Sequence, residues 1–214
     1  VFYGRFSAIF TRSDEYAQSL HKLGIPPSRL LKLRPGIDID LFHPRHADPT
    51  LWDRLAVPAA GPRFLYVGRV SVEKNLPFLA KVWPAVHQRT GASLVVVGDG
   101  PYRPEMQRSL AAKGVHYLGF RFGQELAALY ASSDAFVFPS VTDTLGQVVM
   151  EAQACGIPVV VTNVGGPQEV VQDGRTGRVL PTDPAAWIDA LTALANDHAT
   201  RKQWGVAARQ HLES

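Results

Sequence analysis

Residues 64–97, FLYVGRVSVEKNLPFLAKVWPAVHQRTGASLVVV, are the stretch from which the fold is predicted. The stretch begins and ends with short, continuous apolar runs, Phe64–Val67 and Ser93–Val97, which are typical of strands buried on both faces. Between them, residues at Asn75–His87 show helical spacing. A strand, a helix and a second strand in this order predict one unit of a parallel sheet.

The same alternation continues toward the end of the chain. Strands are expected at Ala135–Phe138 and Pro158–Thr162, and weaker ones at His116–Leu118 and Gly177–Leu180. The repeated order predicts an α/β fold with a doubly wound parallel sheet of the Rossmann-like type. The further helices expected are Pro104–Lys113, Gln124–Ala131, Gln147–Ala154, Pro184–Asn196 and Thr200–Leu212.

The first 62 residues differ from this pattern. They contain a predicted strand at Ala8–Thr11, a helix at Ser13–Leu23 and a strand at Leu30–Leu33, followed by a long loop through Pro62. We interpret residues 1–62 as a linker and remnant leading from another domain. Residues 63–214 are interpreted as one Rossmann-like domain with C-terminal helices, a length that is enough for a full hydrophobic core.

Composition excludes several classes of protein. The net charge of +3 is the difference between 22 basic and 19 acidic side chains, and no basic stripe is present, so a bound phosphate group explains the excess better than nucleic acid does. The single cysteine, Cys155, excludes an internal disulfide and suits a reducing compartment. No apolar run approaches the roughly 18 residues of a membrane span, and no secretory signal is visible, so a cytoplasmic location is expected.

Ligands of open parallel sheets bind beyond the carboxyl ends of the strands. After the first strand come residues 68–75, GRVSVEKN, in which Gly68 permits close backbone approach and Arg69 and Lys74 offer charged hydrogen-bond donors beside a helix start. This combination suits a diphosphate group. The alternative is a solvated loop in which the basic side chains pair with Glu73.

A second segment, residues 139–152 (PSVTDTLGQVVMEA), carries two carboxylates across a junction between loop and helix. Asp143 is expected in the loop and Glu151 in the helix, and carboxylates accept hydrogen bonds from sugar and ribose hydroxyls. The N–H groups of Leu145, Gly146 and Gln147 would point from the helix start toward an anionic or hydroxyl-rich ligand. The alternative makes Asp143 a helix N-cap and Glu151 a surface residue.

Other motifs are interpreted as structural. Residues 98–101, GDGP, resemble a dinucleotide fingerprint that lacks its third glycine. Asp38-Ile39-Asp40 resembles a metal-binding DxD motif but lies in a proline-flanked linker. None of the seven histidines forms a ligand pair at helical spacing, so no metal site is expected.

These motifs together resemble family 4 retaining glycosyltransferases, in the C-terminal, nucleotide-sugar-binding half of their GT-B fold. The resemblance extends from about Ala8 to Arg209. It is carried by Gly68-Arg69 with Lys74, Gly98-Asp99-Gly100-Pro101, Tyr117-Leu118-Gly119-Phe120 and Asp143 through Pro158, while Arg34-Pro35-Gly36-Ile37-Asp38 with Phe42 and Pro44 is similar to the interdomain linker.

The resemblance implies a role for each site residue. Arg69 and Lys74, beside Gly68, would hold the diphosphate of the sugar donor, and Asp143 would contact hydroxyls of the donor sugar; these three side chains are the predicted catalytic set. Glu151 would bind the ribose hydroxyls. The family usually has glutamate at position 143, so aspartate there leaves the sugar specificity open. The backbone near Phe120 and Arg121 would meet the base, and the N–H groups of Leu145, Gly146 and Gln147 would touch the sugar or phosphate.

The activity implied is retaining hexosyl transfer from a nucleotide-diphosphate sugar, with no cofactor and no divalent metal. The acceptor domain would precede this chain, so the chain is expected to be inactive alone, and peripheral membrane contact would occur through that domain. UDP or GDP, the sugar, and the acceptor, whether sugar, lipid or small molecule, are left open. The alternatives are a GT-B-like sugar-nucleotide epimerase and a noncatalytic nucleotide-binding module; the broken glycine fingerprint disfavours an NAD-dependent oxidoreductase.

Overall fold

A computed structural model describes residues 5–33, 36–58 and 61–213 of the chain. Its centre is a six-stranded sheet in the order β5-β4-β3-β6-β7-β8, with every neighbouring pair parallel. The chain moves outward from β3 to β5 and then returns past β3 to start β6, which confirms the predicted doubly wound fold. The strands are β3 (Arg63–Val67), β4 (Ser93–Val97), β5 (Val115–Gly119), β6 (Ala135–Phe138), β7 (Val159–Thr162) and β8 (Gly177–Leu180).

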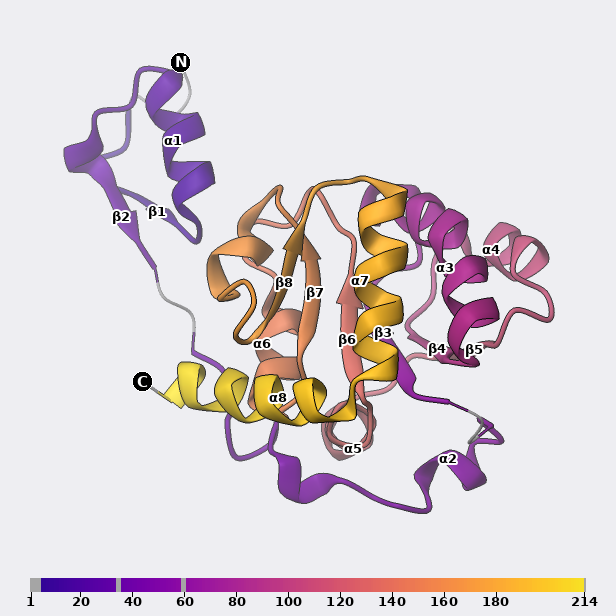
Figure 1. Ribbon diagram of the computed structural model, residues 1–214. Helices are drawn as coiled ribbons and strands as arrows, with labels where there is room; N and C mark the ends of the chain where they lie inside the picture. Colours follow the sequence, from indigo (N-terminus) through magenta and orange to yellow (C-terminus); the bar gives the residue numbers. More distant parts are fainter. Residues whose placement is uncertain (1–4, 34–35, 59–60, 214) are drawn as a thin grey trace.

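Helices cover both faces of this sheet (Figure 1). On one face α3 packs against α7, and on the other α5 packs against α6. The last helix, α8, lies against α6 and α7. The helices are α3 (Leu76–Thr90), α4 (Arg103–Ser109), α5 (Gly123–Ala131), α6 (Gln147–Ala154), α7 (Pro184–Asn196) and α8 (His198–Glu213).

The core lies between the sheet and these helices. All five residues of β4 are buried, as the continuous apolar run predicts for a strand covered on both faces. Trp83 of α3 and Trp187 of α7 are fully buried. Their indole N–H groups donate to the carbonyls of Lys113, at 2.9 Å, and Pro181, at 3.0 Å, so their burial leaves no polar atom unpaired.

Helix α4 ends earlier than the sequence pattern predicts, at Ser109 instead of Lys113. Ala112 and Gly114 have φ values of 56° and 63°, a left-handed backbone that cannot continue a helix and turns the chain into β5. Helix α3, in contrast, runs past the predicted end at His87 to Thr90, where Gly91 terminates it at φ 68°.

The N-terminal segment forms a smaller unit beside the main domain (Figure 1). Strand β1 (Ile9–Thr11) pairs in parallel with β2 (Leu30–Lys32), and α1 (Asp14–Lys22) and the short 3-10 helix η2 (Pro27–Arg29) lie between them in sequence. All three predicted elements of this region are present. Of the predicted interdomain linker, Arg34 and Pro35 lie outside the described residues.

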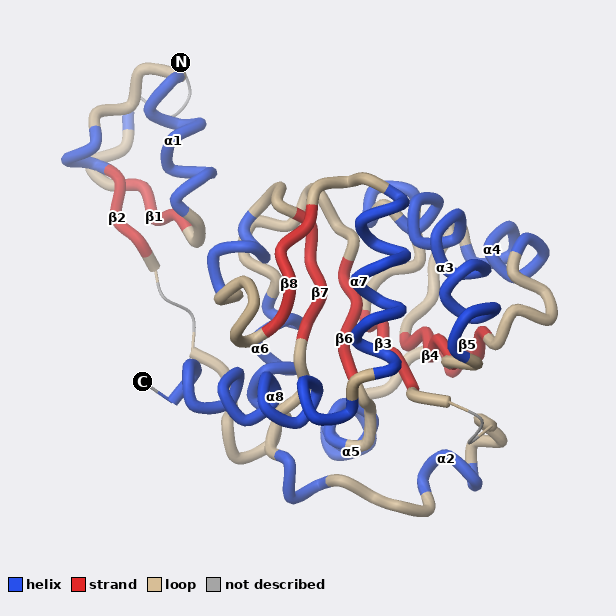
Figure 2. The backbone as a smooth tube through the Cα atoms, viewed as in Figure 1, coloured by secondary structure: helices blue, strands red, loops and turns tan. Residues whose placement is uncertain are grey.

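The loop of residues 36–58 runs along the lower side of the domain in Figure 2 and contains η3 (Pro44–His46) and α2 (Leu51–Arg54). Its side chains Phe42, Trp52 and Val57 are buried in the same hydrophobic cluster as the sheet. The hydrophobic core therefore includes residues that precede the domain boundary predicted at residue 62. The position of that boundary stays a prediction.

Close backbone packing joins α8 to the end of α6. An added Cβ at Gly205 would lie 2.1 Å from the carbonyl oxygen of Gly156. Arg209, one turn later, donates to the carbonyls of Ile39, Phe42 and Ala154 at 3.1, 2.8 and 2.8 Å, so that one guanidinium connects α8, the loop and α6.

Within the described ranges, no helix is both long and apolar enough to cross a membrane.

Gly205→Ala tests this packing. Alanine favours a helix over glycine by about 1 kcal/mol, but the clash is with a backbone carbonyl that cannot rotate away, and overpacking costs about 1–3 kcal/mol. We expect the cost of the clash to exceed the gain in helix propensity, so the free energy of unfolding in urea should fall by about 1–2 kcal/mol. Val206→Ala, on the half-exposed neighbouring position, should change it by less than about 0.5 kcal/mol. A stabilised Gly205→Ala protein would contradict this packing.

Candidate functional site

The loops that follow β3 and β6 meet at the point where the strand order reverses. Lys74, at the end of η4 (Val72–Lys74), places its ammonium nitrogen 2.9 Å from both carboxylate oxygens of Asp143. The two side chains are 21% and 23% exposed, so their attraction is less screened by water than that of a surface pair. Two predicted site residues that are far apart in the sequence are thus in direct contact.

Two further side chains hold these loops together, and a third holds the Asp143 carboxylate within its own loop. Asn75 donates to the carbonyl of Pro139 at 3.2 Å, and Thr142 donates to the carbonyl of Glu73 at 3.2 Å. The fully buried Ser140 donates its hydroxyl to the Asp143 carboxylate. None of the three was among the predicted site residues. The Ser-x-x-Asp spacing is the signal that points to Ser140, whereas the bonds between loops have no local pattern.

Glycines allow the loop after β4 to approach the loop after β3. An added Cβ at Gly98 would lie 2.1 Å from the carbonyl oxygen of Gly68, and one at Gly100 would lie 2.4 Å from that of Val70. The N–H of Val70 in turn donates to the carbonyl of Asp99 at 3.0 Å. The glycines of the GDGP segment therefore shape the backbone under the predicted diphosphate loop, which agrees with their structural interpretation.

Arg69 extends from this loop into solvent. Its side chain is 60% exposed and its guanidinium lies 3.4 Å from the Glu73 carboxylate. The pairing matches the alternative weighed from the sequence, and an exposed pair of this kind contributes little to stability. Arg69 can therefore leave Glu73 for an anionic ligand at small cost.

The start of α6 lies directly after Asp143. Its N-cap is Gly146, at φ 75°, so the expectation that Asp143 could serve as the N-cap is wrong. Glycine supplies the left-handed backbone but no side chain that could accept from the first N–H groups of the helix. Leu145 is buried and Gln147 is exposed.

Glu151 is not the surface residue that the alternative supposed. It is 9% exposed, and one carboxylate oxygen accepts a hydrogen bond of 2.9 Å from the hydroxyl of the fully buried Tyr130. Burial raises the pKa of Glu151, and the hydrogen bond from Tyr130 opposes that shift. A buried carboxylate with a fixed orientation is suited to binding a ligand and is costly as a purely structural group.

Phe120 and Arg121 follow β5, across β4 from the Lys74 loop. The rings of Phe120 and Phe122 stack at a centroid distance of 6.1 Å and are 62% and 73% exposed. Arg121 donates to the carbonyl of Phe120 at 2.8 Å. The segment lies at the same carboxyl edge of the sheet as the other predicted residues.

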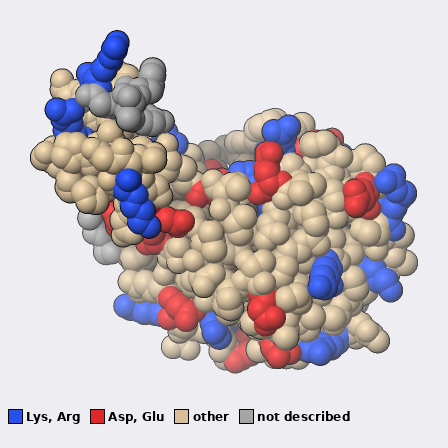
Figure 3. Space-filling model, turned by 90° about the horizontal axis from the view of Figure 1, so that it is seen from above, with Lys and Arg blue, Asp and Glu red and all other residues tan. Residues whose placement is uncertain are grey.

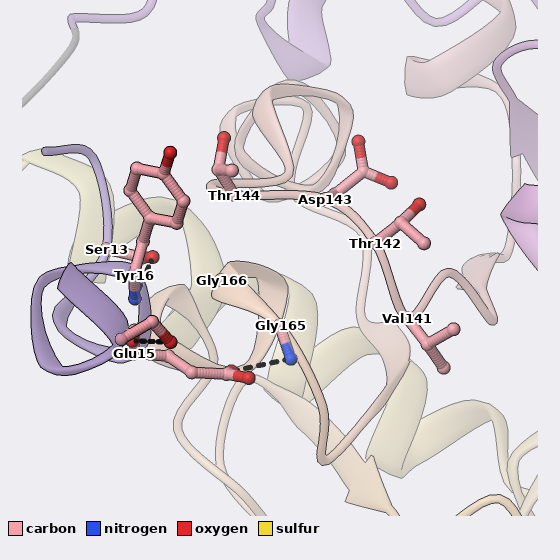
Figure 4. A pocket seen from close by; sticks show the side chains of 10 residues that line it. Ser13, Glu15, Tyr16, Val141, Thr142, Asp143, Thr144, Gly165 and Gly166 are labelled. Carbon is pink, nitrogen blue, oxygen red and sulfur yellow. Dashed lines mark hydrogen bonds between the residues drawn. The ribbon is translucent and has the colours of Figure 1, made fainter. Parts of the chain in front are cut away.

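A pocket lies between this site and the N-terminal unit (Figure 4). Asp143 and Thr144 line one side of it, and Ser13 and Tyr16 of the N-terminal unit line the other. Figure 4 shows Tyr16 and Thr144 from opposite walls with a hydroxyl on each. The pocket is therefore rich in hydroxyl groups and is lined by two carboxylate residues, Glu15 and Asp143, of which Lys74 partly neutralises Asp143.

No group of three or more histidine, cysteine, aspartate or glutamate side chains that could hold a metal ion is found among the described residues. In the DxD segment, Asp38 accepts from the N–H groups of Asp40 and Leu41 at 3.1 and 2.9 Å. Its carboxylate thus caps a turn, as the structural interpretation expects.

Residues 61–197, which contain both loops and the sheet, match the protein family described as "Glycosyl transferases group 1". The chain belongs to this family. Among curated relatives it is 35% identical over 183 residues to the sulfoquinovosyl transferase SQD2 of Arabidopsis thaliana, covering 83% of this chain and 35% of that protein. It is also 35% identical over 215 residues to the D-inositol 3-phosphate glycosyltransferase of Corynebacterium efficiens, covering 94% of this chain and 51% of that protein. The chain thus spans about half or less of the length of these glycosyltransferases.

Solved structures show the same fold. A crystal structure of Anabaena Alr3699/HepE in complex with UDP-glucose matches 98% of this chain and 60% of its own with a TM-score of 0.85 at 23% identity. Sucrose-phosphate synthase from Thermosynechococcus elongatus matches 96% of this chain and 53% of its own with a TM-score of 0.83 at 24% identity. The sheet is that of GT-B glycosyltransferases, as the sequence motifs indicate.

The pKa of Glu151 gives a pH test of its environment. The pKa of Glu151 is raised in the folded protein above the ordinary 4.5, so folding favours the protonated carboxyl group. The stability that this contributes is complete below the unfolded pKa and is lost as pH rises through the folded pKa. Glu151→Gln retains an oxygen for Tyr130 and cannot ionise. We therefore expect the stability of this variant relative to the parent, from urea unfolding, to increase as pH rises above the ordinary pKa of 4.5. A pH-independent difference in stability between Glu151→Gln and the parent would contradict the assignment.

Proposed function

We propose that this chain is the nucleotide-sugar-binding domain of a retaining glycosyltransferase that transfers a hexosyl group from a nucleoside diphosphate. The observation that carries the proposal is the contact of Lys74 with Asp143 at the strand-order reversal. It unites a cation suited to phosphate with a carboxylate suited to sugar hydroxyls, at the edge where doubly wound sheets bind nucleotides.

In this proposal, Lys74 exchanges partners when the sugar donor binds. In the structure its ammonium is neutralised by Asp143, whereas a bound diphosphate would offer more negative charge at hydrogen-bond distance. The released Asp143 would then accept hydrogen bonds from hydroxyls of the donor sugar. Arg69, which is held only by an exposed pair with Glu73, would add a second cation to the diphosphate.

The same groups would assist bond cleavage. Negative charge grows on the diphosphate as the sugar leaves, and Lys74, Arg69 and the N–H groups of Leu145, Gly146 and Gln147 would stabilise that charge. These roles require no divalent metal. Glu151, oriented by Tyr130, would bind the ribose hydroxyls, and the backbone near Phe120 and Arg121 would meet the base.

The names of related proteins support a nucleotide-sugar donor without selecting the base. Alr3699/HepE was crystallised with UDP-glucose. The GDP-mannose-dependent alpha-mannosyltransferase of Mycolicibacterium smegmatis is 38% identical over 179 residues, covering 83% of this chain and 45% of its own length. The acceptor, in this proposal, is bound by a domain that precedes the chain, so the chain should bind the sugar donor and transfer it poorly.

Removal of a positive charge from residues 68–75, the loop proposed to bind the diphosphate, tests the proposal. Lys74→Ala and Arg69→Ala should each weaken binding of UDP or GDP by about 1.5–3 kcal/mol, the value of a hydrogen bond to a charged group. Isothermal titration of the chain with both nucleotides measures this. Arg89→Ala removes a cation from an exposed pair with Asp189 on another surface and serves as the matched control. Tight binding of either nucleotide that both loop variants leave unchanged would rule out the diphosphate assignment.

A further inference from the structure

The N-terminal unit is held to the main domain by a carboxylate from η5 (Gly166–Val170). The two carboxylate oxygens of Glu169 accept from the N–H groups of Asp14 and Glu15, at 2.8 and 3.0 Å. These are the first two residues of α1, whose N–H groups have no partner within the helix. Glu169 thus caps a helix that belongs to the other unit.

A second carboxylate makes the reverse contact. Glu15, on α1, accepts from the N–H of Gly165 at 2.7 Å and from the side-chain amide of Gln168 at 3.4 Å. Gly165 precedes η5, so Glu15 satisfies a backbone group at the start of the helix that carries Glu169. The two contacts are reciprocal, and breaking either one would leave backbone N–H groups at a helix start to solvent.

Charge favours this arrangement. The positive end of the α1 dipole attracts the Glu169 carboxylate. Lys32 of β2 lies 3.3 Å from Glu169 and 2.6 Å from Asp14, so the carboxylates that gather here share a cation. Figure 3 shows side chains of both signs where the smaller unit meets the main body. The Glu169 side chain is 21% exposed, which limits the screening of these contacts.

The contact is connected directly to the proposed sugar site. The N–H of Gly166 donates to the carbonyl of Asp143 at 2.8 Å, and an added Cβ at Gly166 would lie 2.0 Å from the carbonyl oxygen of Thr144. The start of η5 therefore packs on the backbone of the loop that carries Asp143. A shift of α1 relative to η5 changes the distance between the two walls of the pocket.

We propose that Glu15 and Glu169 form a reciprocal latch that fixes α1 against η5 and so sets the separation between Tyr16 and the Asp143–Thr144 wall. Both are positioning residues, because they hold backbone groups and not the ligand. The consequence for the sugar rests on the function proposed above, whereas the latch itself does not. With the latch closed, the sugar of the donor has a wall on each side; with it open, only the wall of the main domain, with Asp143 and Thr144, remains beside the sugar.

Amide exchange in the unliganded chain tests the latch without any ligand. In the 15N-labelled chain, the amides of Asp14 and Glu15 should be protected from hydrogen exchange although they lie at a helix start. Glu169→Ala should lower that protection by about tenfold or more, and Glu169→Gln should restore part of it because one amide oxygen can still accept. Glu15→Ala should lower the hydrogen-exchange protection of the Gly165 amide in the same way. The control Asp189→Ala removes an exposed carboxylate on α7 and should change none of these amides.

Two results would overturn the latch: unprotected Asp14 and Glu15 amides in the parent chain, or protection that Glu169→Ala leaves intact. Heteronuclear spectra of each variant show whether signals of the main domain keep their positions. A variant that unfolds only α1 would lose protection throughout residues 14–22, whereas loss of the latch should be confined to the helix start and to Gly165.

A second measurement separates the latch from the proposed function. Glu169→Ala should retain the parent affinity for UDP within about threefold and lose at least about fivefold for UDP-glucose, relative to the control. Equal affinities for UDP-glucose in Glu169→Ala and parent would show that the latch does not position the sugar wall. If the parent chain binds neither UDP- nor GDP-linked ligands, the proposed function fails while the exchange result still decides the latch.

Discussion

The parallel pairing of β3 with β6, which places Phe64 opposite Ala135 and Leu65 opposite Phe136, determines where every other part of the site can lie. The chain reaches this pairing only after completing β4 and β5 on the other side of β3, so the loops after β3 and β6 leave the sheet side by side. Buried apolar contacts hold the strands, which frees the loops to carry polar groups. Lys74 meets Asp143 because of this topology and not because of any closeness in sequence.

The electrostatics of the pair suit exchange with a ligand. A fully buried ion pair would be hard to separate, since each partner would be left as an uncompensated charge, and a fully exposed pair would not orient its side chains. Lys74 and Asp143 lie between these limits, at 21% and 23% exposure. Ser140 fixes the carboxylate and Asn75 fixes the loop, so in the proposed function a diphosphate would bind Lys74 while Asp143 keeps its position.

Sequence patterns predicted the sheet and most helix bounds because continuous apolar strands and helical spacing are local properties. They placed the end of α4 too late, at Lys113, because nothing in the local pattern marks the left-handed backbone of Ala112, which a helix reaching Lys113 could not include. They also proposed Arg69, Lys74, Asp143 and Glu151 as site residues, and the structure brings Lys74 and Asp143 together. The contacts of Glu151 with Tyr130 and of Glu169 with α1 could not be predicted, because they join residues whose proximity is set by tertiary packing alone.

The affinities of Asp143→Asn for a nucleotide and for the matching nucleotide sugar show whether Lys74 exchanges partners. Removal of the carboxylate charge frees Lys74, so the variant should bind UDP or GDP as tightly as the parent or more tightly. The same variant should bind the matching nucleotide sugar more weakly relative to the free nucleotide than the parent does, because the acceptor of sugar hydroxyl bonds is lost. Equal weakening for the nucleotide and the nucleotide sugar in Asp143→Asn, measured by titration, would contradict this exchange of partners.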